Sequence, residues 1–131
     1  MLITRKVEFS ASHVCRHPNP EAAENRPHGH NFVAEITLAG EPDPVTGMVF
    51  DLKRLKEILH REIVEPYDHR FLNHEAPPFD RVVPTPENIA REIWRRLEPH
   101  FPKPALRLHN VRLYETEDLY VDCSGEEAPC A

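Results

Sequence analysis

Residues 28–38 have the sequence His-Gly-His-Asn-Phe-Val-Ala-Glu-Ile-Thr-Leu, in which apolar and polar side chains alternate. Side chains of a β-strand point alternately to its two faces, so this period of two predicts a strand with one buried face. The expected buried face consists of Phe32, Ala34, Ile36 and Leu38. His28 and His30 extend that same face toward the start of the strand.

The N-terminal segment alternates in the same way, with an apolar parity that contains Ile3, Val7, Phe9 and Ala11. This pattern predicts a second half-buried strand, and His13 continues its apolar parity. Residues 14–27 contain prolines and asparagines but no apolar period, so we expect a loop there. A turn-rich connection is expected from Gly40 to Gly47.

Two helices are predicted in the middle of the chain. The first begins after Asp51, a good N-cap, carries a stripe of Leu52, Leu55, Leu59 and Ile63, and is expected to end at Pro66. A short helical piece is expected around Asp68–Asn73. The second helix follows the sequence Thr85-Pro86-Glu87, in which Thr85 suits the N-cap and Pro86 the first helical position. Pro99 closes it.

Two further strands are predicted, from about Leu106 to Thr116 and around Leu119 to Cys123. The element order then gives an α+β domain in residues 1–131, with a four-stranded antiparallel sheet and two helices on one face. Open sheet edges of this kind are often covered by association between subunits.

Composition narrows the classes of function. The formal net charge is -6, from 22 acidic and 16 basic residues, which argues against nucleic acid or an anionic membrane as a partner. No apolar run approaches the roughly 20 residues of a membrane span. The three cysteines show no disulfide framework, and no signal peptide is recognisable, so the cytoplasm is the expected compartment.

The histidines give the sharpest functional signal. His28 and His30 project from one face of a strand, and His13 stands at the end of the neighbouring strand. Three imidazoles with an open fourth position are typical of a catalytic zinc site. Gly29 is expected to permit close backbone approach between the two ligands. His17 competes for the third place, but it lies in a proline-flanked loop.

Two acidic positions also indicate chemistry. Asp68 next to His69 can orient the imidazole and form a general acid/base pair, although a solvated surface pair is the commoner outcome. Glu115 shares parity with Val111 and Leu113 and should face the covered side of its strand. Its partner is then an arginine, or a ligand with two adjacent N–H donors, such as a pterin or guanine ring.

Six ordered motifs carry a resemblance to a known family. They are Phe9-Ser10-Ala11-Ser12-His13, His28-Gly29-His30-Asn31-Phe32, Gly47-Met48-Val49-Phe50-Asp51-Leu52, Asp68-His69-Arg70-Phe71-Leu72-Asn73, Pro84-Thr85-Pro86-Glu87-Asn88-Ile89-Ala90 and Tyr114-Glu115-Thr116. The chain resembles the 6-pyruvoyl-tetrahydropterin synthase family, which includes the bacterial 6-carboxytetrahydropterin synthases of queuosine biosynthesis.

The resemblance implies a tunnelling fold, with subunits joined into a barrel and a homohexamer built from two trimers. It implies zinc on His13, His28 and His30, with active sites between subunits and 7,8-dihydroneopterin triphosphate as substrate. By their positions in the motifs, Asp68 and His69 match the family's acid/base pair, and Glu115 matches the pterin anchor. Thr85 and Glu87 fall in a segment that lines the pterin pocket.

One position departs from the family. The bacterial pattern places a catalytic cysteine four residues before the first histidine of His-Gly-His, and Glu24 stands there in this chain. Glutamate at this place is similar to a subgroup that cleaves the side chain and releases 6-hydroxymethyl-dihydropterin. Glu21 stays a second candidate for the base, and we interpret Cys15 as a structural thiol.

Three functions therefore compete. The first is a zinc-dependent lyase that forms a tetrahydropterin or cleaves the side chain. The second is a pterin- or purine-binding module that has lost catalysis with its cysteine, and the third is a zinc hydrolase of a purine triphosphate. We rank the lyase first, because Asp68 and His69 accompany the full histidine set.

Overall fold

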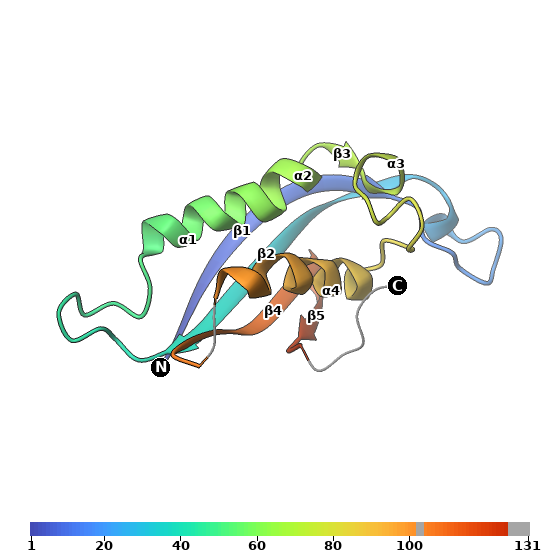
Figure 1. The fold of residues 1–131 in the computed structure, drawn as a ribbon. Helices are drawn as coiled ribbons and strands as arrows, with labels where there is room; N and C mark the ends of the chain where they lie inside the picture. Colours follow the sequence, from blue (N-terminus) through green and yellow to red (C-terminus); the bar gives the residue numbers. More distant parts are fainter. Residues whose placement is uncertain (102–103, 126–131) are drawn as a thin grey trace.

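The computed structural model of the chain describes residues 1–101 and 104–125 and contains one five-stranded sheet (Figure 1). The strand order is β3-β1-β2-β4-β5. The bounds are β1 Leu2–His13, β2 His28–Gly40, β3 Arg70–Phe71, β4 Leu106–Thr116 and β5 Leu119–Cys123. The four strands expected from the alternating patterns are confirmed, and they pair antiparallel in the order in which they follow one another.

The prediction of four strands was wrong by one. The additional strand β3 pairs in parallel with β1 at Ala11 and Ser12, so the sheet is mixed. The backbone N–H of His69 donates to the carbonyl oxygen of Ser10 at 2.6 Å and brings the chain alongside β1. Two residues are too few to show an alternating pattern, which is why the sequence did not indicate this strand.

The first helix is longer than expected. It runs through α1 (Leu52–Leu59), a π-helical turn η2 (His60–Val64) and α2 (Glu65–Tyr67), so Pro66 does not end it. The π-turn precedes Pro66, which therefore falls in the first turn of α2, where a proline is tolerated because it needs no N–H there. The helix ends at Tyr67 because Asp68 is extended.

The helical piece expected at 68–73 was also wrong. This stretch forms a turn, the strand β3 and only then the short helix α3 (Leu72–Glu75). The second main helix, α4 (Pro86–Leu97), is confirmed, and the Thr85 hydroxyl accepts the backbone N–H of Asn88 at 3.2 Å. Short 3-10 turns, η1 (Ala23–Asn25) and η3 (Glu98–His100), complete the helical elements of the described residues.

The helices α1 and α4 lie on the same side of the curved sheet, and the core fills the space between the two layers (Figure 1). The predicted inner face of β2 is fully buried, and the rings of Phe9 and Phe32 stack at 5.0 Å between centroids. Among the described residues, no helix has the length and apolarity needed to cross a membrane. Most of the tail from Ser124 to Ala131, which we expected to be loose, lies outside the described residues.

Candidate functional site

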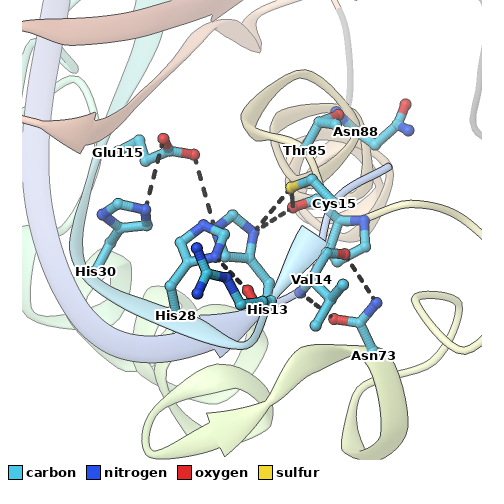
Figure 2. A network of polar contacts seen from close by, with 11 residues as sticks. His13, Val14, Cys15, His28, His30, Asn73, Thr85, Asn88 and Glu115 are labelled. Atoms are coloured by element: carbon cyan, nitrogen blue, oxygen red, sulfur yellow. Dashed lines mark hydrogen bonds and ion pairs between the residues drawn. The ribbon is translucent and has the colours of Figure 1, made fainter. Parts of the chain in front are cut away.

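The pairing of β1 with β2 gathers the three predicted histidines. His13 lies directly opposite His28 in the register, and His30 lies opposite Ala11, one pair further along the same face. One ligand atom from each histidine falls within 4.8 Å of the other two, and the ring centroids are 4.4–5.3 Å apart (Figure 2). His13 is fully buried, whereas His28 and His30 are half-buried.

Backbone carbonyls orient two of these rings. His13 Nδ1 lies 2.6 Å from the carbonyl oxygen of Pro84, and His28 Nδ1 lies 2.8 Å from that of Arg26. A carbonyl oxygen only accepts, so each Nδ1 carries the proton and each Nε2 is left with a lone pair. Burial is the main cause that lowers the pKa of His13, which favours its neutral, metal-binding form.

The Nε2 atoms fit a metal ion. Those of His13 and His30 are buried, and neither has a hydrogen-bond partner in the described structure. Buried polar nitrogens are normally paired, so two unpaired ones beside a third imidazole are the arrangement that a metal ligated by three nitrogens requires. Among the residues that the structure describes, His13, His28 and His30 form the cluster of metal-ligating side chains.

Gly29 between the two ligands is not forced to be glycine. A Cβ atom at this position would meet the carbonyl oxygen of Ala11 at 3.6 Å, which is an ordinary contact. The expected need for close backbone approach is therefore not seen. His17, the competing ligand, is exposed in the loop, and its Nδ1 accepts the backbone N–H of Asn19 at 3.0 Å.

Glu115 reaches the histidine cluster from β4. Its Oε1 lies 3.6 Å from His30 Nε2 and its Oε2 lies 3.9 Å from His13 Nε2 (Figure 2). The carboxylate is 17% exposed and faces the covered side of the sheet, as its parity with Val111 and Leu113 predicted. The sequence left an arginine or a ligand as the partner of Glu115. Among the described residues no arginine pairs with it, since both of its ion pairs are to histidine.

Cys15 lies beside His13, on the side of the ring that carries Nδ1. Its Sγ lies 3.7 Å from His13 Nδ1 and 4.0 Å from the Pro84 carbonyl oxygen, on the ring edge away from Nε2 (Figure 2). Burial, followed by the negative charges of Glu115, Glu24 and Glu87, raises the pKa of the thiol to about 11. A thiol of this kind stays protonated near neutral pH, which agrees with a structural role.

The glutamates of the loop differ in position. The backbone N–H of Cys15 donates to the carbonyl oxygen of Glu24 at 2.7 Å, so the loop folds back and brings Glu24 beside the cluster. The charge of Glu24 acts on the Cys15 thiol, as does that of Glu87 in the first turn of α4. Both glutamates are exposed, but the charge that acts on Cys15 is that of Glu24, whereas the backbone N–H of Glu21 donates to the Asn19 side chain.

Asp68 and His69, the predicted acid/base pair, lie beside Ser10 of β1. Asp68 Oδ2 is 2.9 Å from His69 Nδ1, and Asp68 Oδ1 accepts the backbone N–H of Ser10 at 2.8 Å. The Ser10 hydrogen bond is the largest cause that lowers the pKa of Asp68, so the carboxylate is ionised beside the ring. His69 has a φ of 58° and its side chain is 83% exposed. A surface hollow of about 530 Å³ is lined by both His69 and His30.

Backbone groups are what sequence reasoning missed at this site. The carbonyls of Pro84 and Arg26 orient two rings, and Asn73 fixes the end of β1 through two hydrogen bonds to the backbone of Val14. The Thr85 hydroxyl is used as the cap of α4. Carbonyls leave no trace in residue identity, whereas Asn73 falls in a quoted motif without a role having been assigned to it.

Comparison with known proteins places this geometry in a family. The model of the 6-pyruvoyl tetrahydropterin synthase family matches residues 2–126. Human 6-pyruvoyl tetrahydrobiopterin synthase is 36% identical over 141 aligned residues, which cover 95% of this chain and 91% of the human protein. The solved structure of Caenorhabditis elegans 6-pyruvoyl tetrahydropterin synthase has a TM-score of 0.82 and 31% identity, covering 96% of both chains.

A second solved structure shares the fold. It is of the Plasmodium vivax 6-pyruvoyltetrahydropterin synthase with a catalytic glutamate changed to alanine, and it matches with a TM-score of 0.68 at 17% identity, covering 94% of this chain and 97% of that one. The histidine cluster, the family match and the two closely similar relatives agree. The chain belongs to the 6-pyruvoyl tetrahydropterin synthase family.

Proposed function

We propose that this protein is a zinc-dependent lyase that acts on 7,8-dihydroneopterin triphosphate. The observation that carries the proposal is the pair of buried, unpaired Nε2 atoms of His13 and His30 in a cluster in which backbone carbonyls hold Nδ1 of His13 and of His28. His13, His28 and His30 would hold the ion. A bound zinc supplies Lewis-acid polarisation of the hydroxyl groups on the substrate side chain.

The remaining roles belong to side chains of the chain itself. Glu115 can accept two adjacent N–H groups of a pterin ring through its two oxygens. Asp68 holds the His69 ring by Nδ1, so His69 Nε2 is free to take or give a proton. Thr85 and Glu87 begin α4 beside the cluster, in the position proposed for the wall of the pterin pocket.

Glu24 is proposed as a base in the place of the family cysteine. Its position beside the cluster favours it over Glu21, and a glutamate is a catalytic residue of the Plasmodium vivax synthase. Because a glutamate at this place resembles the subgroup that cleaves the substrate side chain, a base at Glu24 favours the second candidate reaction, which releases 6-hydroxymethyl-dihydropterin. The first candidate reaction eliminates triphosphate and forms a 6-pyruvoyl- or 6-carboxytetrahydropterin.

Product analysis separates these reactions. The purified protein is incubated with 7,8-dihydroneopterin triphosphate, and the pterin product is identified by mass spectrometry. A non-catalytic binding module gives no product, and consumption of GTP instead indicates the hydrolase. Glu24→Ala is expected to abolish turnover while Glu21→Ala, in the same loop, keeps it. The reverse result moves the role of base to Glu21.

Metal content tests the ligand set. Zinc bound per chain, measured by elemental analysis, should fall in His28→Ala and stay at one equivalent in His17→Ala, the matched control from the loop. Loss of zinc in His17→Ala would instead show that His17 is a ligand.

The proposed hexamer with shared active sites is tested by mixing inactive variants. His69→Asn is suited to this, because Asn tolerates the positive φ at this position. If the pair acts on substrate held by a neighbouring subunit, refolding His69→Asn together with His28→Ala restores activity in hybrid oligomers. Hybrids that stay inactive place the pair and the metal of one active site in one chain.

A further inference from the structure

Glu115 and the histidine cluster meet in an arrangement that needs a positive charge between them. His13 donates its Nδ1 proton to Pro84, so its Nε2 presents a lone pair toward Glu115 Oε2 at 3.9 Å. Glu115 Oε1 faces His30 Nε2, also buried and without a hydrogen-bond partner, at 3.6 Å. The lone pair of His13 Nε2 and the mostly buried Glu115 carboxylate repel one another unless a cation lies between them, and the unpaired Nε2 of His30 faces the same carboxylate.

The spacing matches the edges of a coordination tetrahedron. Zinc bonds of about 2.0–2.2 Å to imidazole nitrogen and carboxylate oxygen place neighbouring ligand atoms about 3.4 Å apart. The observed distances, 3.6 Å from Oε1 to His30 Nε2 and 3.9 Å from Oε2 to His13 Nε2, are close to this value, so a small turn of the carboxylate would bring one oxygen to the position of a fourth ligand. In the described part of the chain no lysine or arginine forms an ion pair with Glu115. A metal ion bound by the histidines is therefore the cation that would balance the charge of this carboxylate.

We propose that Glu115 is the fourth protein ligand of the metal in the substrate-free protein and that it leaves the metal when the pterin ring binds. This inference rests on the proposed function. One oxygen of the carboxylate would bind the metal first, and both oxygens would accept the N–H groups of the pterin afterwards. The exchange breaks one metal–oxygen bond and frees one coordination position for the substrate, with no change in oxidation state.

In this arrangement, binding of the pterin ring by Glu115 also frees a coordination position on the metal. A ligand that lacks two adjacent N–H donors does not draw Glu115 away, so the fourth position stays closed to it. Water and small anions are excluded for the same reason, since a site closed by four protein ligands behaves like a structural site.

The experiment uses the full chain with Co²⁺ in place of zinc, because the visible spectrum of Co²⁺ reports coordination number and exogenous ligands. Azide is titrated into the wild type, Glu115→Gln and the matched control Glu117→Gln, which changes an exposed glutamate two residues away. Glu115→Gln should bind azide at least 10-fold more tightly than the wild type. Its affinity for Co²⁺, measured by chelator competition, should fall on the order of 10–100-fold.

Glu117→Gln should match the wild type in both measurements. Adding neopterin, a pterin without the triphosphate, should shift the wild-type spectrum toward that of Glu115→Gln. Equal azide binding by wild type and Glu115→Gln overturns the inference and leaves the proposed function standing. A wild type that binds no Co²⁺ or zinc overturns the proposed function itself, so the two failures are distinguishable.

Discussion

His13 on β1 and Pro84, the residue before the cap of α4, are joined by a contact of 2.6 Å between Nδ1 and the carbonyl oxygen. This contact ties the orientation of a proposed metal ligand to the start of a helix 71 residues further along the chain. The helix begins there because Thr85 caps it and Pro86 fits its first turn. A substitution of the capping residue should therefore disturb the orientation of His13 and weaken metal binding.

We expect Thr85→Val to lower the free energy of unfolding by about 1 kcal/mol and to weaken zinc binding. Asp51→Ala is the matched control, since Asp51 caps the other main helix, α1, through the backbone N–H of Lys53. Urea unfolding should show a similar loss in both variants, and chelator competition should show weaker zinc only in Thr85→Val. Equal zinc affinity in the two variants contradicts the link through Pro84.

Cys15 should be a poor nucleophile in the metal-free protein. A pKa of about 11 lies two units above the reference value of 9.0, so the thiolate fraction at pH 7.5 is about 100-fold below that of an ordinary thiol. Alkylation by iodoacetamide, followed by peptide mass spectrometry, should be slow at residue 15 and accelerate up to about pH 11. Cys15→Ser should keep most of the turnover, and its loss would return the catalytic role to this thiol.

Gly29→Ala should keep both stability and zinc binding, because the added Cβ meets only the Ala11 carbonyl oxygen at 3.6 Å. Gly40→Ala provides the contrast, since its Cβ would lie 3.0 Å from the carbonyl oxygen of Ala105. Thermal unfolding should show little change or a gain of up to about 1 kcal/mol for the first variant and a loss for the second. A strong loss of zinc in Gly29→Ala would show that glycine is needed there after all.

Asp68 should contribute stability that depends on pH. Its pKa is lowered in the folded protein, chiefly by the backbone N–H of Ser10, so folding favours the charged form. The contribution is present above the ordinary pKa of 3.8 and disappears as the pH falls through the lowered folded value. Asp68→Asn should thus be destabilised at pH 7, with the difference shrinking below pH 4.

The control for this series is Asp80→Asn, because Asp80 is exposed and lies 3.9 Å from its neighbour Arg81. Unfolding by urea at several pH values compares the two variants with the wild type. If the free energy of unfolding of Asp68→Asn differs from that of the wild type by the same amount at every pH, the hydrogen bond from Ser10 does not stabilise the charged form of Asp68.

The sequence predicted those parts of the fold in which a period repeats. The apolar alternation of β1 and β2 and the stripe of α4 persist over many residues, and all three elements were predicted correctly. The histidine cluster was anticipated for the same reason, since His13, His28 and His30 continue the parity of strands that pair. Their convergence follows from the register alone.

The errors lie where tertiary contacts override local pattern. Pro66 stops a regular helix, yet a π-turn before it changes the register and lets the helix continue to Tyr67. Strand β3 exists because Asp68 and His69 bond to the backbone of Ser10, a contact between positions 58 and 59 residues apart. A repeating pattern within one element cannot indicate such a contact. The carbonyls of Arg26 and Pro84 that orient the histidines could not be predicted either, because every residue has a backbone carbonyl.

The pairing of His13 with His28 also bears on the order in which the site forms during synthesis. His13, His28 and His30 all precede Pro84 and Glu115 in the chain, so every proposed nitrogen ligand is made before these two residues. The carbonyl of Pro84 and the carboxylate of Glu115 emerge much later. The β1–β2 hairpin thus supplies all three proposed nitrogen ligands by itself, and the later chain adds the Pro84 carbonyl that orients His13.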